Sequence, residues 1–126
     1  MLDRLWHAIA AAMVSWHGGK LFIEHAVRID HDALHVIVGL LLWVVLALVL
    51  RRPLTSARPW LWVLAFILWN ETVDLWIEHW PEPAMQYGEG ARDVVLTMFL
   101  PTVLMFAARA RPDLFRGRAG KRSPRR

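Results

Sequence analysis

The sequence predicts an all-α fold, a polytopic membrane helical bundle with three transmembrane helices and an additional N-terminal helix. The chain has 126 residues, enough for one domain, and 56% of them are hydrophobic. The apolar residues gather in three runs, at 33–50, 59–69 and 94–108. A soluble domain of this size has no use for three such runs, whereas a helix of about 20 apolar residues crosses the hydrocarbon of a bilayer.

The N-terminal helix is expected over about residues 5–27 and can be placed in two ways. Apolar residues of its first half, among them Trp6 and Ile9, share one helical face, which is typical of amphipathic helices at the membrane interface. In that arrangement, two short helices separated at Gly18 would lie on the outer surface. The alternative is a helix that spans the membrane, which Arg4 favours as a cytoplasmic flank.

The three transmembrane helices are expected over about residues 32–50, 59–80 and 91–108. Pro59 suits the first turn of the second helix, where its missing N–H costs nothing. In the third helix, Pro101 removes the hydrogen bond to the carbonyl of Thr97, a loss that membrane helices tolerate where neighbours compensate. With the N-terminal helix, these segments form a single transmembrane domain, residues 1–110.

Charge is distributed unevenly along the chain and predicts its orientation. Of the 15 lysines and arginines, eight lie in residues 109–126, and ten of the 11 acidic residues precede Val94. Under the positive-inside rule, the connection at 51–58 and the C-terminus face the cytoplasm, and residues 81–90 face outward. Residues 111–126 are expected to be a basic, disordered cytoplasmic tail. Next to a membrane helix, such a tail indicates an anchor rather than a nucleic-acid-binding segment.

The stretch WNETVDLWIEHW, at 69–80, places Glu71, Asp74 and Glu78 in a membrane-like segment. At about 3.6 residues per turn, these carboxylates share one face of the second transmembrane helix. The opposite face carries a tryptophan stripe, which consists of Trp62, Trp69, Trp76 and Trp80. Because ionisable side chains within a membrane nearly always face the bundle interior or a water-filled cavity, the carboxylates are expected to point inward. The tryptophan stripe would then contact membrane lipid or another membrane protein subunit.

Polar residues of all three transmembrane helices fall at a similar height, in the outer half of the membrane. With a rise of about 1.5 Å per residue, His35, Glu71 and Asp93 come to comparable levels. We therefore predict one polar site there, either a ligand-binding pocket or a structural network. Its candidate residues are His31, Asp32, His35, Asn70, Glu71, Asp74, Glu78, Arg92 and Asp93.

Carboxylates that lie close together in a low dielectric cannot all be ionised unless positive charge is near them. Arg92, a protonated histidine, a cationic head group or a metal ion could supply that charge. A divalent metal would be held by His31 and His35, which are spaced i, i+4, together with Glu71 and Asp74. In the alternative without a metal, His35 hydrogen-bonds a carboxylate and holds two helices together.

Three short motifs resemble the VanZ-like membrane proteins. DHDALHVIV contains an acidic residue and His35, NETVD contains Glu71, and GEGARDVVLT contains Arg92 and Asp93. The sequence departs from the family pattern in lacking the usual lysine, in having Asp74 where glutamine is usual, and in having the arginine and aspartate of the last motif adjacent. The resemblance implies a small multispan protein of the bacterial cell envelope, in the inner (plasma) membrane, linked to glycopeptide resistance.

These patterns leave three functional hypotheses. The first is a non-enzymatic protein whose acidic and histidine-containing pocket binds a polar lipid head group, an envelope precursor or a cationic ligand. The second is an accessory subunit that docks on a larger membrane complex through the tryptophan stripe. The third is a metal-dependent membrane enzyme acting on a lipid-linked substrate, with Glu71 or Asp74 as base. The sequence contains no cysteine, which excludes thiolate metal sites and cysteine nucleophiles, and no catalytic residue is predicted.

Overall fold

The structure is a computed structural model that describes residues 2–27 and 29–114. Its elements are four α-helices and one short 3-10 helix, namely α1 (Leu2–Val27), α2 (His31–Val49), α3 (Ala57–Ile77), α4 (Pro83–Ala110) and η1 (Pro112–Leu114). The described residues form no strand, so the predicted all-α fold is confirmed. By length and composition, the helices α2, α3 and α4 can each cross a membrane. The expected tail, residues 111–126, lies outside the described residues from position 115 onward.

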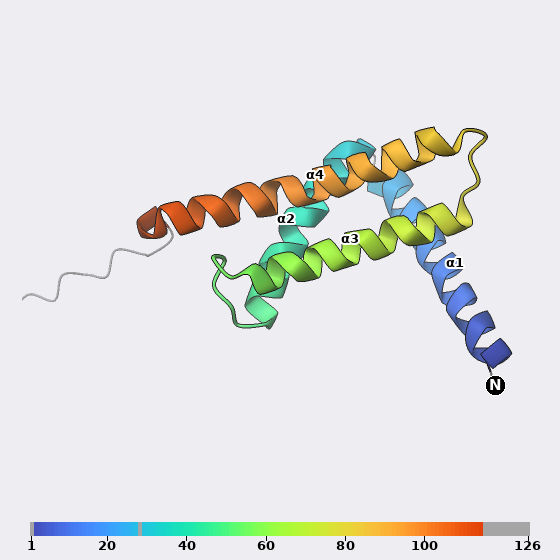
Figure 1. Ribbon diagram of the computed structural model, residues 1–126, viewed down its shortest axis with the longest axis horizontal. Coiled ribbons are helices and arrows are strands. Elements are labelled where there is room, and N and C mark those ends of the chain that lie inside the picture. The colour runs from blue at the N-terminus through green and yellow to red at the C-terminus, as the bar shows by residue number, and fades with distance from the viewer. Residues whose placement is uncertain (1, 28, 115–126) are drawn as a thin grey trace, which may run out of the picture.

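The three candidate membrane helices pack on one another around an apolar core. Figure 1 shows α3 and α4 running antiparallel, with α2 crossing behind them. The buried residues of this core are Trp43, Val63, Ile67, Met98 and Met105. We call the end of the bundle where α2 begins, α3 ends and α4 begins the acidic end, and we call the opposite end the basic end.

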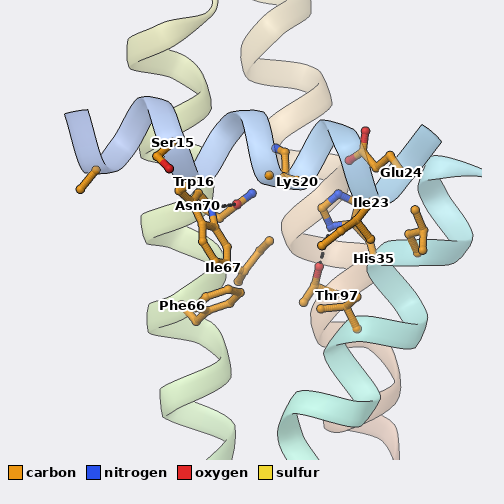
Figure 2. Close-up of a pocket in the computed structure, with 14 residues that line it drawn as sticks. Ser15, Trp16, Lys20, Ile23, Glu24, His35, Phe66, Ile67, Asn70 and Thr97 are labelled. Carbon is orange, nitrogen blue, oxygen red and sulfur yellow. Dashed lines mark hydrogen bonds between the residues drawn. The ribbon is translucent and has the colours of Figure 1, made fainter. Parts of the chain in front are cut away.

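Helix α1 lies across the acidic end rather than alongside the other helices (Figure 1, Figure 2). Near its N-terminus, the ring of Trp6 contacts the ring of Trp76 in the last turns of α3, with 5.9 Å between the ring centroids. Near its C-terminus, Glu24 Oε1 lies 3.3 Å from Nδ1 of His31, the first residue of α2. Both ends of α1 are therefore at the acidic end, whereas a spanning helix would have its ends at opposite ends of the bundle. The structure favours the interfacial arrangement, although as one continuous helix without a break at Gly18.

Prolines place two helix boundaries away from their expected positions. The pattern predicts that the second transmembrane helix reaches residue 80, but α3 ends at Ile77. Pro81 has no N–H to donate to the carbonyl of Ile77, and it disfavours helical backbone at Trp80. It also predicts that the third begins near residue 91, but α4 begins at Pro83, where the missing N–H of proline costs nothing. Gln86, in the first turn of α4, donates from Nε2 to the carbonyl of Glu78 at 2.8 Å. This bond satisfies a backbone acceptor just after the end of α3.

Helices α2 and α4 approach each other closely at Gly39 and Thr97. A Cβ atom added to Gly39 would lie 2.0 Å from the carbonyl oxygen of Thr97, so only glycine fits. This is also the carbonyl to which Pro101, four residues later, has no N–H to donate. The glycine therefore brings a Cα–H group against a carbonyl that lacks its usual helical donor, a weak hydrogen bond common at helix–helix contacts.

The basic end is organised around the α2–α3 connection. Arg51 follows α2 with a left-handed backbone, at a φ of 50°, and turns the chain back toward the bundle. Ser56 then caps α3, its Oγ accepting a hydrogen bond from the N–H of Arg58 at 3.3 Å. Arg109, near the end of α4, donates from Nε to the carbonyl of Thr55 at 2.8 Å. This bond joins the last turn of α4 to the connection.

Replacing Gly39 by alanine should strongly destabilise the bundle. Because the obstructing atoms are backbone, α2 and α4 would have to move apart, and we expect a cost of at least about 1–3 kcal/mol in the free energy of unfolding. Thermal unfolding in detergent would measure it. The matched control is Gly18→Ala, since an added Cβ there meets nothing within 4 Å. That control should be neutral or stabilising by about 0.5–1 kcal/mol, and equal effects of both changes would contradict the proposed close contact.

Candidate functional site

The predicted polar residues meet at the acidic end, but in two clusters rather than one. The α3 cluster consists of Asn70, Glu71, Asp74 and Glu78 with Trp16, His17 and Lys20 of α1. The α4 cluster consists of Asp93, Arg92 and Thr97 with Glu24, His31, Asp32 and His35. Helix α1 contributes to both clusters because it crosses the whole acidic end (Figure 2).

Asp74 is the centre of the α3 cluster. Lys20 of α1 forms an ion pair with its carboxylate, and His17 Nδ1 lies 2.9 Å from Oδ1. Asn70 Nδ2 donates to Oδ2 of the same carboxylate at 3.2 Å, and Trp16 Nε1 donates to Asn70 Oδ1 at 3.0 Å. The second of these bonds is drawn in Figure 2. Trp16, His17 and Lys20, which lie within about one turn of α1, thus fasten this helix to α3 through one aspartate and a nearby amide.

Asp93 is the centre of the α4 cluster. It is buried, and its Oδ2 lies 3.3 Å from Nε2 of His31 and 3.4 Å from Nε2 of His35. The Nδ1 atoms of both rings have other partners. His35 Nδ1 lies 2.9 Å from Thr97 Oγ1, and His31 Nδ1 lies 3.3 Å from Glu24 Oε1. The distance between His35 and Asp93 agrees with the prediction that they lie at one level. Figure 2 shows the hydrogen bond between His35 and Thr97.

Arg92 does not neutralise the carboxylates of α3. Its guanidinium pairs with Asp32 at the start of α2 and lies 3.4 Å from Glu89 of its own helix. Arg92 is exposed on α4 and lies next to the first turn of α2, so its guanidinium reaches α2 rather than α3. Lys20 of α1 supplies the positive charge for Asp74 instead.

Glu71 differs from the other acids of the α3 and α4 clusters in having no ion pair among the described residues. Its exposed fraction is only 8%, and its one hydrogen bond comes from Asn70 Nδ2 to Oε1 at 3.2 Å. The second carboxylate oxygen faces α4 at Gly90, where an added Cβ would lie 3.0 Å from Oε2. A buried carboxylate without a cation is costly, so this position requires either a proton or a positively charged ligand.

Two adjoining cavities lie between α1 and the bundle. The larger has a volume of about 630 Å³ and is mostly apolar, with Trp16, Ile23, Leu34, Val38, Phe66 and Ile67 among its lining residues. The smaller has a volume of about 190 Å³ and contains the acids of both clusters, including Glu71, Asp74 and Asp93. Lys20 and Glu24 line both cavities, so the two meet under α1. Figure 2 shows the apolar cavity with α1 passing over it.

The sequence did not assign Trp16, His17, Lys20 and Glu24 to the site. Trp16, Lys20 and Glu24 are spaced by four residues and thus share one helical face, which was the available signal. That face could be assigned to the site only if α1 were already known to cross the bundle. Helical periodicity shows which residues share a face, but it does not show which other helix that face contacts.

The tryptophan stripe is partly covered by α1. The ring of Trp69 lies 5.4 Å from that of Trp16, and Trp76 contacts Trp6. Trp62 remains 60% exposed. Trp80 follows the end of α3, and its Nε1 donates to Glu78 Oε2 at 2.9 Å. The stripe is therefore shorter as a free surface than the helical projection predicts.

The four residues predicted to hold a metal do not converge. His31 and His35 lie with Asp93 in the α4 cluster, whereas Glu71 and Asp74 lie on α3 with other partners. His31, His35 and Asp93 each offer a ligand atom, and these atoms lie within 4.8 Å of one another. The acid that completes the histidine pair comes from α4 rather than α3.

No family model matches the chain, and no curated protein or solved structure is significantly similar to it. Its function must therefore be inferred from its own residues.

The Lys20–Asp74 pair should contribute much more to stability than the Arg92–Asp32 pair. The side chains of the first pair are 20% and 15% exposed, against 53% and 34% for the second. Lys20→Met leaves a partly buried carboxylate without its cation, and we expect a loss of about 3 kcal/mol in the free energy of unfolding. Arg92→Met makes the same charge change at an exposed pair and should cost less than about 1 kcal/mol.

Unfolding of both variants in detergent would give the two free energies. Amide hydrogen exchange would also show faster exchange in α1 for Lys20→Met and unchanged exchange there for Arg92→Met. A Lys20→Met protein with wild-type stability and wild-type protection of α1 would show that this pair does not fasten the helix.

Proposed function

We propose that this chain is an integral membrane protein that binds an amphipathic ligand whose head group carries a cationic amine, such as the ammonium of zwitterionic phosphatidylethanolamine. The observation that carries the proposal is the position of Glu71. This carboxylate is buried, has no ion pair among the described residues, and lines an acidic cavity that adjoins a large apolar one. An amphipathic molecule matches that pairing, with its apolar chain in the larger cavity and its charged group beside Glu71.

The size and lining of the apolar cavity support a small-molecule ligand. Ligand pockets typically have volumes of about 300–1,000 Å³ and are mostly apolar with a few polar groups. The cavity of about 630 Å³ fits that description, and its polar lining residues are Ser15, Lys20, Glu24, His35, Asn70 and Thr97. It lies below an interfacial helix, where the chain of a membrane lipid could enter from the bilayer.

The charge of the smaller cavity supports a positively charged head group. Its lining contains six carboxylates, those of Glu24, Glu71, Asp74, Glu78, Glu89 and Asp93, against one lysine and one histidine. Lys20 already pairs with Asp74 and His31 lies between Glu24 and Asp93, which leaves Glu71 without a counter-charge. A cationic group would be attracted to this cavity, and an anionic one repelled.

We further propose that the protein lies in the bacterial inner membrane with its C-terminus in the cytoplasm. The arginines of the basic end, including Arg51, Arg58 and Arg109, support this orientation through the positive-inside rule. The acidic end would then be in the outer leaflet. The VanZ-like motifs are in keeping with such a protein, because Asp32, His35, Glu71, Arg92 and Asp93 all lie at this end. The proposed activity is binding, with no catalytic step.

Glu71→Gln should abolish binding of an amine-bearing lipid without unfolding the protein. The amide keeps the shape of the side chain and removes only its charge, so we expect at least about a tenfold loss of affinity. Purified protein can be titrated with phosphatidylethanolamine and, separately, with anionic phosphatidylglycerol, and the bound lipid counted by native mass spectrometry. Glu82→Gln is the control, since Glu82 is exposed and lines neither cavity. Equal binding of the two lipids, or of Glu71→Gln and wild type, would refute the cationic head group.

Filling the apolar cavity should also prevent binding. Gly19 lines this cavity, and a Cβ added there meets nothing within 4 Å, so Gly19→Phe can project its ring into the empty volume. Gly18→Phe is the matched control. An added Cβ at residue 18 also meets nothing within 4 Å, but this residue does not line the cavity. We expect Gly19→Phe to lose most lipid binding in the same assay and Gly18→Phe to keep it. If both variants bind as wild type does, the lipid chain lies elsewhere.

A further inference from the structure

The side chains of His31, His35 and Asp93 are arranged as a set of ligands around one point. The two Nε2 atoms lie 3.3 and 3.4 Å from the same oxygen, Asp93 Oδ2. Zinc ligands at about 2.0–2.1 Å in tetrahedral geometry are separated from one another by about 3.3 Å. The histidines are on one face of α2 and the aspartate is on α4, so the set also joins two helices.

The outer ring nitrogens have the partners that metal-bound histidines usually have. Nδ1 of His35 lies 2.9 Å from the hydroxyl of Thr97, and Nδ1 of His31 lies 3.3 Å from a carboxylate oxygen of Glu24. Such acceptors take the Nδ1 proton and leave Nε2 as the free ligand atom. Both Nε2 atoms here are the ones that point at Asp93.

Asp93 also retains an unused ligand atom. Its Oδ1 is buried and has no hydrogen-bond partner among the described residues, although the residue is only 6% exposed. A buried carboxylate oxygen without a partner is costly. A metal ion beside the carboxylate would compensate for it, whereas the two histidines reach only Oδ2.

Two other groups of side chains at the acidic end could offer metal ligands, but acids in each of them already pair with a lysine or an arginine. In the group formed by His17, Asp74 and Glu78, Asp74 is paired with Lys20. The third group, Asp32, Glu89 and Asp93, includes two acids that pair with Arg92. In the described part of the chain, no lysine or arginine forms an ion pair with any member of the His31, His35 and Asp93 set.

We propose that His31, His35 and Asp93 bind one divalent transition metal ion of the type that prefers nitrogen and oxygen ligands, such as Zn²⁺. Three protein ligands leave a coordination position open to a small molecule or a polar head group. The site does not use Glu71, although His31 and Asp93 line the same small cavity as that residue, so it goes beyond the proposed binding of a cationic ligand. It also differs from the metal site expected from the sequence, in which Glu71 and Asp74 complete the set.

The test is metal binding by the full chain, purified in detergent with a tag that contains no histidine and stripped with a chelator. On addition of Zn²⁺ alone, wild type should bind about one equivalent, measured by elemental analysis after gel filtration. His31→Ala and Asp93→Asn should each lower the affinity at least about tenfold, and Thr97→Val, which removes only the outer partner of His35, about 10- to 100-fold. His25→Ala is the control, since His25 is exposed and contacts its own helix at Leu21.

A second measurement avoids any dependence on how well the variants fold. Co²⁺ bound to wild type at this site should give the visible absorption bands of a four- or five-coordinate ion, and Zn²⁺ should displace it. Wild type that binds neither metal would overturn the proposal, as would a folded Asp93→Asn protein with wild-type zinc affinity. Glu71→Gln should bind zinc normally, so failure of the lipid assay and failure of the metal assay can be told apart.

Discussion

The pairing of Lys20 with Asp74 fixes the position of α1, and most features of the acidic end depend on it. Without this pair, α1 would contact α3 through the aromatic rings of Trp6 and Trp16, the hydrogen bond from Trp16 to Asn70 and the approach of His17 to Asp74. The pair holds the helix across the bundle, which encloses the apolar cavity from above and brings Glu24 to His31. One charge-assisted contact thus forms the cavity and completes the polar groups around it.

Four acids at the acidic end are compensated in different ways, and this division gives the site its chemical character. Asp74 has a lysine, Asp32 an arginine and Asp93 two histidines. Glu71 has only the amide of its neighbour Asn70. Fully paired acids hold helices together, whereas incompletely compensated ones remain available to a ligand. Asp74 and Asp32 therefore join helices through a cation, and Glu71 and Asp93 are the acids to which the proposed ligands are assigned.

The fold was largely predictable because three apolar runs and helical periodicity are local properties of the sequence. The boundaries of α3 and α4 were less predictable, since Pro81 could end a helix at several positions and Pro83 could begin one. Helical projection correctly brought His35 and Asp93 to one level. It could not indicate that Arg92 pairs with Asp32 or that Lys20 reaches Asp74, because those contacts depend on crossing directions between helices that are distant in sequence. Tertiary contacts of that kind leave no period to detect.

Thr97 links two parts of the structure that are usually independent. Its hydroxyl lies beside His35 of α2, and its carbonyl is in contact with Gly39, which is also on α2. With no room for a side chain between them, α2 and α4 cannot slide or rotate past one another without breaking both contacts. Both contacts therefore tie the part of α2 that carries the histidines to α4, the helix that carries Asp93. Entry to the apolar cavity then falls to α1, which has no buried residue but can tilt away only if its contact with Asp74 breaks.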